Sequence, residues 1–148
     1  MALTFISRSA AYIRAVLGNQ FIDQDAAVAA IRTLPMDVQD GITAHAGGGQ
    51  AGAVPLILGN NRVTTVVTTG DSVLAPTASA GQDFILVNDG ANTLHVFASP
   101  VLNPVTGALD TIDGVANATG NTVTAGHRVQ FFTCADGNWL TTASVAST

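Results

Sequence analysis

The chain has 148 residues and a mass of 15.0 kDa, the size of one ordinary domain with a single core. Its formal net charge is -5, and the 5 basic residues are all arginines that lie scattered along the chain. This balance argues against a nucleic-acid-binding protein, which needs clustered cations to contact phosphates, and no apolar run is long enough to predict a membrane-spanning helix.

Two similar short helices are expected within residues 5–34. Ser7 and Asp23 can each accept hydrogen bonds from the free amides of a first helical turn, and Gly18 and Pro35 are typical of helix ends. Each helix carries one narrow apolar stripe and cannot form a core alone, so each stripe has to contact another surface. The large members of these stripes are candidate interaction residues: Ile13, Leu17, Ile31 and Leu34.

The segment TAHAGGGQAGA, Thr43 to Ala53, follows the helical part. A phosphate-binding P-loop needs a lysine after its glycines, and the chain has no lysine. A dinucleotide-binding loop lies between a strand and a helix, the reverse of the order expected here. We therefore expect residues 42–61 to form a glycine-rich joint that allows close chain approach and positive φ, with His45 and Gly48 as candidate interaction residues.

Residues 62–148 are expected to form an all-β domain, because short β-branched and aromatic runs alternate there with Gly, Asn, Asp and Pro. The Asp-Gly pairs of NDGAN and ADGN predict tight hairpins. The predicted fold is mainly β, an antiparallel β-sandwich or jelly-roll-like barrel with a short N-terminal α-helical arm in residues 1–41. The expected strands lie near residues 62–69, 72–76, 83–88, 93–98, 110–115, 122–126, 128–134 and 138–144.

The residues that carry chemistry in enzymes show no motif in this chain. His45, His95 and His127 lack the short spacing of metal motifs, most aspartates stand in turn contexts, and there is no glutamate to serve as a general acid. Ser72 lacks the pattern of a nucleophile elbow. We therefore expect no enzymatic activity, no cofactor and no metal. One open variant is a homotrimer in which His45 and its two copies bind an ion on the axis.

Two single residues have expected places in the core. Cys134 lies in the apolar run RVQFFTC and is expected to be a buried, structural thiol. Trp139 is the only tryptophan and is expected to pack in the core beside Phe131 or Phe132.

Five stretches within residues 42–142 carry a resemblance to a known family: TAHAGGGQAGA, RVTTVVTTGDSVLAP, GQDFILVNDGANTLHVFA, DTIDGVANATG and FFTCADGNW. Together they resemble a recurrent small virion-protein domain of tailed bacteriophages, of the kind used as a capsid decoration or cement protein. The resemblance implies a homotrimer on the outer face of the head that clamps neighbouring major capsid subunits. It also implies a location on the virion and, during assembly, in the host cytoplasm.

The expected partners are therefore further copies of this chain and the phage major capsid protein, with no nucleic acid and no membrane. Two other classes stay open on the sequence. One is a tail-fibre or baseplate adhesin whose β domain binds a host surface glycan. The other is a secreted hydrolase or lectin, which would bring several acidic side chains together.

Overall fold

The computed structural model describes residues 37–147. These residues form strands and turns, with no helix among them. The described residues therefore include no helix that could cross a bilayer. The expected helical arm lies outside the described residues except for residues 37–41, most of which belong to the first strand. Four of the candidate interaction residues lie outside them too: Ile13, Leu17, Ile31 and Leu34.

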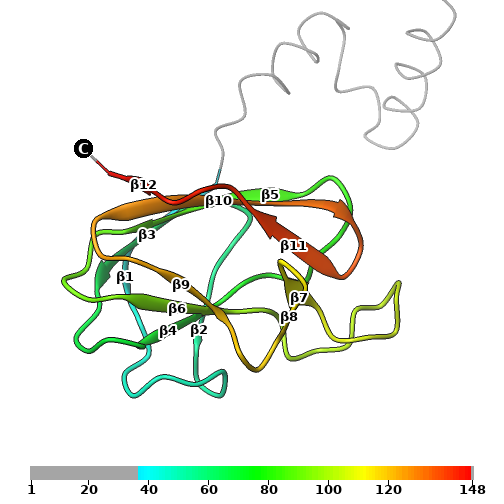
Figure 1. Cartoon of the computed structure of the whole chain (residues 1–148), viewed down its shortest axis with the longest axis horizontal. Helices are drawn as coiled ribbons and strands as arrows, with labels where there is room; N and C mark the ends of the chain where they lie inside the picture. The colour runs from blue at the N-terminus through cyan, green and yellow to red at the C-terminus, as the bar shows by residue number, and fades with distance from the viewer. Residues whose placement is uncertain (1–36, 148) are drawn as a thin grey trace, which may run out of the picture. The chain divides into compact units, whose positions relative to one another are not determined.

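The strands form two sheets, and in Figure 1 β3, β5, β10, β11 and β12 of the larger sheet are drawn above β2, β4, β6 and β9 of the smaller one. The larger sheet has the order β1-β3-β5-β10-β11-β7-β8, with β12 also paired to β10, and the smaller one has the order β2-β4-β6-β9. The bounds are β1 (Val38–Thr43), β2 (Val54–Pro55), β3 (Gly59–Thr65), β4 (Ser72–Leu74), β5 (Asp83–Asn88), β6 (Leu94–Phe97), β7 (Thr111–Ile112), β8 (Val115–Ala116), β9 (Asn121–Val123), β10 (His127–Ala135), β11 (Asn138–Thr141) and β12 (Val145–Ala146).

The first six strands alternate between the two sheets, so each successive pair of strands makes one coil of the chain. In the larger sheet β1 is parallel to β3 and β3 to β5, and in the smaller sheet β2 is parallel to β4 and β4 to β6. The result is a solenoid-like stack of coils. β9 and β10 then return antiparallel to β6 and β5 and extend both sheets.

The prediction of an antiparallel β-sandwich or jelly-roll-like barrel was wrong. Among the first six strands, neighbours along the chain lie in different sheets, and each strand pairs in parallel with the strand one coil later in its own sheet. NDGAN illustrates the difference. It carries the chain from β5 to β6 in the other sheet, and the side chain of Asn88 shapes this crossing by accepting a hydrogen bond from the Gly90 amide at 3.0 Å. ADGN does form the expected hairpin, between β10 and β11, with Gly137 at φ 84°.

The core between the sheets contains an aromatic cluster from β5, β10 and β11. The rings of Phe84 and Phe131 stack at 4.5 Å between centroids, and Trp139 meets Phe84 edge-on at 4.9 Å. Trp139 is fully buried, which confirms its expected core position, and its Nε1 donates a hydrogen bond to the carbonyl of Pro76 at 2.9 Å. This bond ties β11 to the connection between β4 and β5.

Cys134 is exposed, so the prediction of a buried thiol was wrong. The alternation of β10 explains its exposure, because Val129, Phe131 and Thr133 point into the core and Cys134 belongs to the opposite set. The apolar neighbours of Cys134 in the sequence therefore do not share its environment.

Candidate interaction site

The glycine-rich segment lies within the β structure, where it forms the loop between β1 and β2. Its hydrogen bonds reach two later strands of the smaller sheet, at β4 and at the end of β6. The hydroxyl of Ser72 in β4 donates a hydrogen bond to the Gly49 carbonyl at 2.8 Å, and the side-chain amide of Gln50 donates to the carbonyl of Ala98 just after β6 at 2.8 Å. The loop therefore has a defined shape that fastens the coils together.

Gly48 and His45, the two candidate residues in the described part of the chain, both belong to this structure. Gly48 has φ 68°, and a Cβ added there would lie 2.9 Å from the carbonyl oxygen of Gly70. The His45 ring is half-buried and lies over Gly52, where an added Cβ would come within 2.8 Å of the ring. Both residues thus have a structural role at this loop. The loop keeps this shape because Gly48 and Gly52 carry no side chain.

Asp71 connects the glycine-rich loop to the turn before β4. Its buried carboxylate accepts hydrogen bonds from the Thr68 hydroxyl at 2.6 Å, from the amides of Thr68 and Val67 at 2.9 and 2.8 Å, and from the Gly47 amide at 3.2 Å. The Thr68 hydroxyl, followed by the Thr68 amide, holds the pKa of Asp71 below its usual value. Asp71 is therefore a structural anion that holds two loops by accepting hydrogen bonds.

A second loop, residues 100–109 between β6 and β7, is the clearest candidate contact surface. We call it the apolar loop, because it exposes four large aliphatic side chains. Figure 1 shows it projecting away from the two sheets, at the right of the view. The exposed fractions of these residues are 64% for Val101, 60% for Leu102, 68% for Val105 and 44% for Leu109.

The apolar loop is held in place by a buried amide at its base. The Asn103 side chain donates hydrogen bonds to the carbonyl of Ala78 at 2.7 Å and to the Asp110 carboxylate at 2.9 Å, and it accepts from the amides of Val105 at 3.0 Å and Thr106 at 3.3 Å. Asn103 and Asp110 are both almost fully buried. The aliphatic side chains are therefore presented by an ordered loop, and ordered apolar side chains clustered in water are typical of contact surfaces.

Sequence reasoning missed the apolar loop, because Pro, Asn and Gly in SPVLNPVTGALD indicate an ordinary turn. A usable signal was present. The segment carries four large aliphatic residues with neither the alternation of a strand nor the spacing of a helix, so no expected element buries them.

The residues considered for metal or acid chemistry do not converge in the described structure. His95 packs edge-on against Phe97 at 5.9 Å, and Nδ1 of His127 lies 3.0 Å from the Ala125 carbonyl oxygen. Within residues 37–147, no three His, Cys or Asp side chains form a group that could hold a metal ion.

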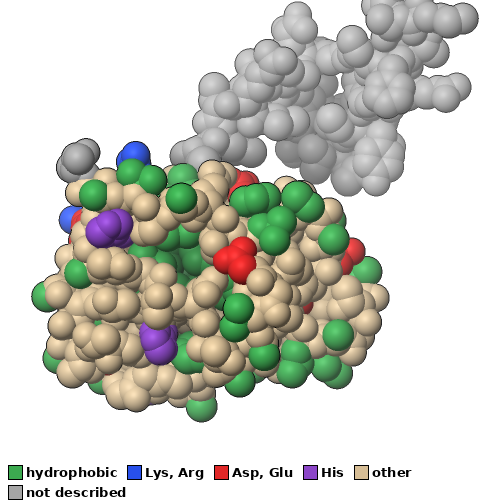
Figure 2. Space-filling view, viewed as in Figure 1, with side chains coloured by type: hydrophobic (Ala, Val, Ile, Leu, Met, Phe, Trp, Pro, Cys, Tyr) green, Lys and Arg blue, Asp and Glu red, His purple; other side chains and the backbone are tan. Residues whose placement is uncertain are grey.

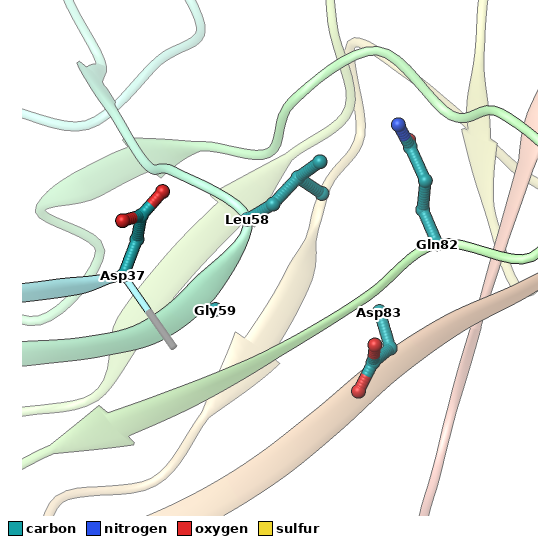
Figure 3. A pocket seen from close by; sticks show the side chains of 5 residues that line it. All are labelled: Asp37, Leu58, Gly59, Gln82 and Asp83. Atoms are coloured by element: carbon teal, nitrogen blue, oxygen red, sulfur yellow. The ribbon is translucent and has the colours of Figure 1, made fainter. Parts of the chain in front are cut away.

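One open hollow of about 290 Å³ lies beside the starts of β3 and β5. Figure 3 shows its lining, in which Asp37, just before β1, and Asp83, the first residue of β5, point their carboxylates in different directions. In this view Leu58 lies between them, and Gln82 lies beside Asp83. The two carboxylates are therefore not arranged as an acid and base pair.

Comparison with known protein families, with characterised proteins and with solved structures finds no match to this chain.

Proposed function

We propose that this chain is a structural protein of the virion of a tailed bacteriophage, a homotrimeric decoration protein that binds the major capsid protein on the outer surface of the head and stabilises it. The observation that carries the proposal is the ordered apolar loop, which presents four aliphatic side chains on a rigid body. The resemblance of residues 42–142 to small phage virion proteins supplies the class of partner.

The composition and the fold of the chain suit a protein that makes a repeated surface contact. A decoration protein makes the same contact many times over a symmetric shell, so three modest contacts in one trimer suffice for tight attachment. A surface of short Thr, Asn, Ala and Gly side chains loses little side-chain entropy when it is covered. The stack of coils, fastened by the glycine-rich loop and by Asn103, keeps the contact surface in a fixed shape.

The experiment is a reconstitution on heads of the phage that carries this chain. Purified chain is added to heads that lack it, unbound protein is removed by sedimentation, and the bound amount is measured against concentration. We expect saturable binding to heads, and light scattering of the free protein should give three times the 15.0 kDa of one chain.

Retention on isolated tails or on host cells instead of heads would favour the adhesin alternative. A monomer or dimer mass at micromolar concentration would contradict the homotrimer.

A further inference from the structure

The charges of the described residues are distributed unevenly. Residues 37–147 carry eight aspartates and two arginines, Arg62 in β3 and Arg128 in β10. Both arginines stand opposite Val87 of β5 in the sheet register, so they share the outer face of the larger sheet. Arg62 is also engaged by Asp89 at 2.6 Å. In Figure 2 the arginine side chains in view lie on the side opposite to the apolar loop.

Two aspartates lie at the base of the apolar loop, the buried Asp110 and the half-buried Asp136. Asp110 closes its base, and the turn that contains Asp136 and Gly137 lies against it, because a Cβ added at Gly137 would be 3.3 Å from the Thr106 side chain. Asp136 is half-buried, and its carboxylate accepts a hydrogen bond from the Ala80 amide at 2.9 Å. A surface that covers this loop therefore gains from positive charge around its edge.

The size of the apolar loop argues against self-association through this loop alone. Four aliphatic side chains, each between 44% and 68% exposed, present about a few hundred Å² of apolar surface. A stable complex buries about 800 Å² on each partner. The loop is therefore too small to hold two copies of the chain together, but three loops on one trimer are enough for attachment to a surface that repeats the same pocket.

We infer that the apolar loop is the attachment element of the protein, and that it inserts into an apolar pocket with a basic rim on the surface of a different protein. This inference rests on the proposed function, in which that protein is the major capsid protein. Val101 and Val105 are the most exposed aliphatic side chains of the loop, so their methyl groups are the ones that the pocket covers.

The test compares two variants of the full chain in the reconstitution on virion parts. V101S/V105S removes methyl groups from the loop and keeps its backbone, its prolines and its Asn103 anchor. V67S is the matched control, because Val67 is 64% exposed and lies in the turn before β4, outside the apolar loop. Both variants should keep the wild-type circular dichroism spectrum and melting temperature, since the substituted side chains face solvent.

We expect V101S/V105S to bind heads at least about tenfold more weakly than the wild type, and V67S to bind within about twofold of it. Raising the NaCl concentration from about 50 mM to about 500 mM should weaken wild-type binding severalfold, because salt screens the attraction between the acidic loop region and a basic rim.

Several results would overturn the inference. Equal binding of V101S/V105S and wild type would show that the loop does not make the contact. A smaller mass of V101S/V105S in light scattering would show that the loop contacts a second copy, and unchanged binding with a lower melting temperature would show that it packs within its own chain. Binding that does not depend on salt would refute the basic rim.

The failure of the proposed function has a different signature. If the wild type is retained on tails and not on heads, the proposed function fails, and the same two variants are compared on tails. Loss of binding by V101S/V105S alone would then still support the loop as the attachment element. Wild-type chain retained on no part of the virion would overturn both.

Discussion

Replacing Gly48 by alanine tests whether the glycine-rich loop has a required shape or is a loose tether. Gly47, Gly48 and Gly49 all have positive φ, at 90°, 68° and 92°. They differ in what an added Cβ would meet. At Gly48 it would lie 2.9 Å from the carbonyl oxygen of Gly70, whereas at Gly47 and Gly49 there is nothing within 4 Å.

The three substitutions share one energetic term and differ in another. An alanine at positive φ costs about 1–2 kcal/mol at each position. The gain from a stiffer unfolded chain is also the same for all three. Only G48A forces a backbone carbonyl to move, and crowding of this kind costs a further ~1–3 kcal/mol. We therefore expect G48A to lower the free energy of unfolding by ~2–5 kcal/mol and G47A and G49A by ~1–2 kcal/mol.

Urea unfolding of the full chain, followed by the fluorescence of Trp139, measures these differences. The buried indole reports on the core, and the chain has no other tryptophan. If G48A and the two neighbouring variants shift the unfolding midpoint equally, the packing of Gly48 against Gly70 contributes nothing. If none of the three shifts it, the loop is a tether and its hydrogen bonds do not stabilise the fold.

Three further results are expected. W139F should lower the free energy of unfolding by ~2–4 kcal/mol in urea, because it leaves a cavity and an unpaired Pro76 carbonyl, and a loss below ~1 kcal/mol would contradict the packing described. The pKa of Asp71 is lowered from its ordinary value of 3.8, so near and below that pH the unfolded chain binds more protons than the folded chain. The melting temperature should therefore fall as the pH drops below about 4, and it should fall more steeply in the wild type than in D71N. Identical slopes in the two proteins would refute this. Cys134 should react with a maleimide in the native protein within minutes, and protection until urea is added would contradict its exposure.

The positions of most strands could be predicted from the sequence, but their pairing could not. DFILVN and RVQFFTC were expected as strands and form β5 and most of β10. Short runs between frequent turn residues fit an antiparallel sandwich and a stack of coils equally well. The choice depends on where each turn sends the chain, and at Asn88 it depends on side-chain hydrogen bonds to Asn92 and Val123. The contact with Val123 joins residues 35 positions apart, and the order of residues along the chain does not show it.

The first coil was not expected, because its strands have little β propensity. β1 contains Gly41 at φ 72° and an irregular register with β3, and β2 is two residues long and ends in Pro55. These features are typical of edge strands, where irregularity and proline prevent pairing with another chain. Gly48 was singled out on the sequence, but the carbonyl that it packs against lies 22 residues later, and sequence spacing does not show this contact.

The proposed location on the phage head is tested most directly by cryo-electron microscopy of intact virions that contain the chain. We expect density for three copies around a local threefold position on the outer surface of the head, with the apolar loop at the contact with the major capsid protein. Density for this chain on the tail, or a contact on the head that leaves residues 100–109 in solvent, would contradict it.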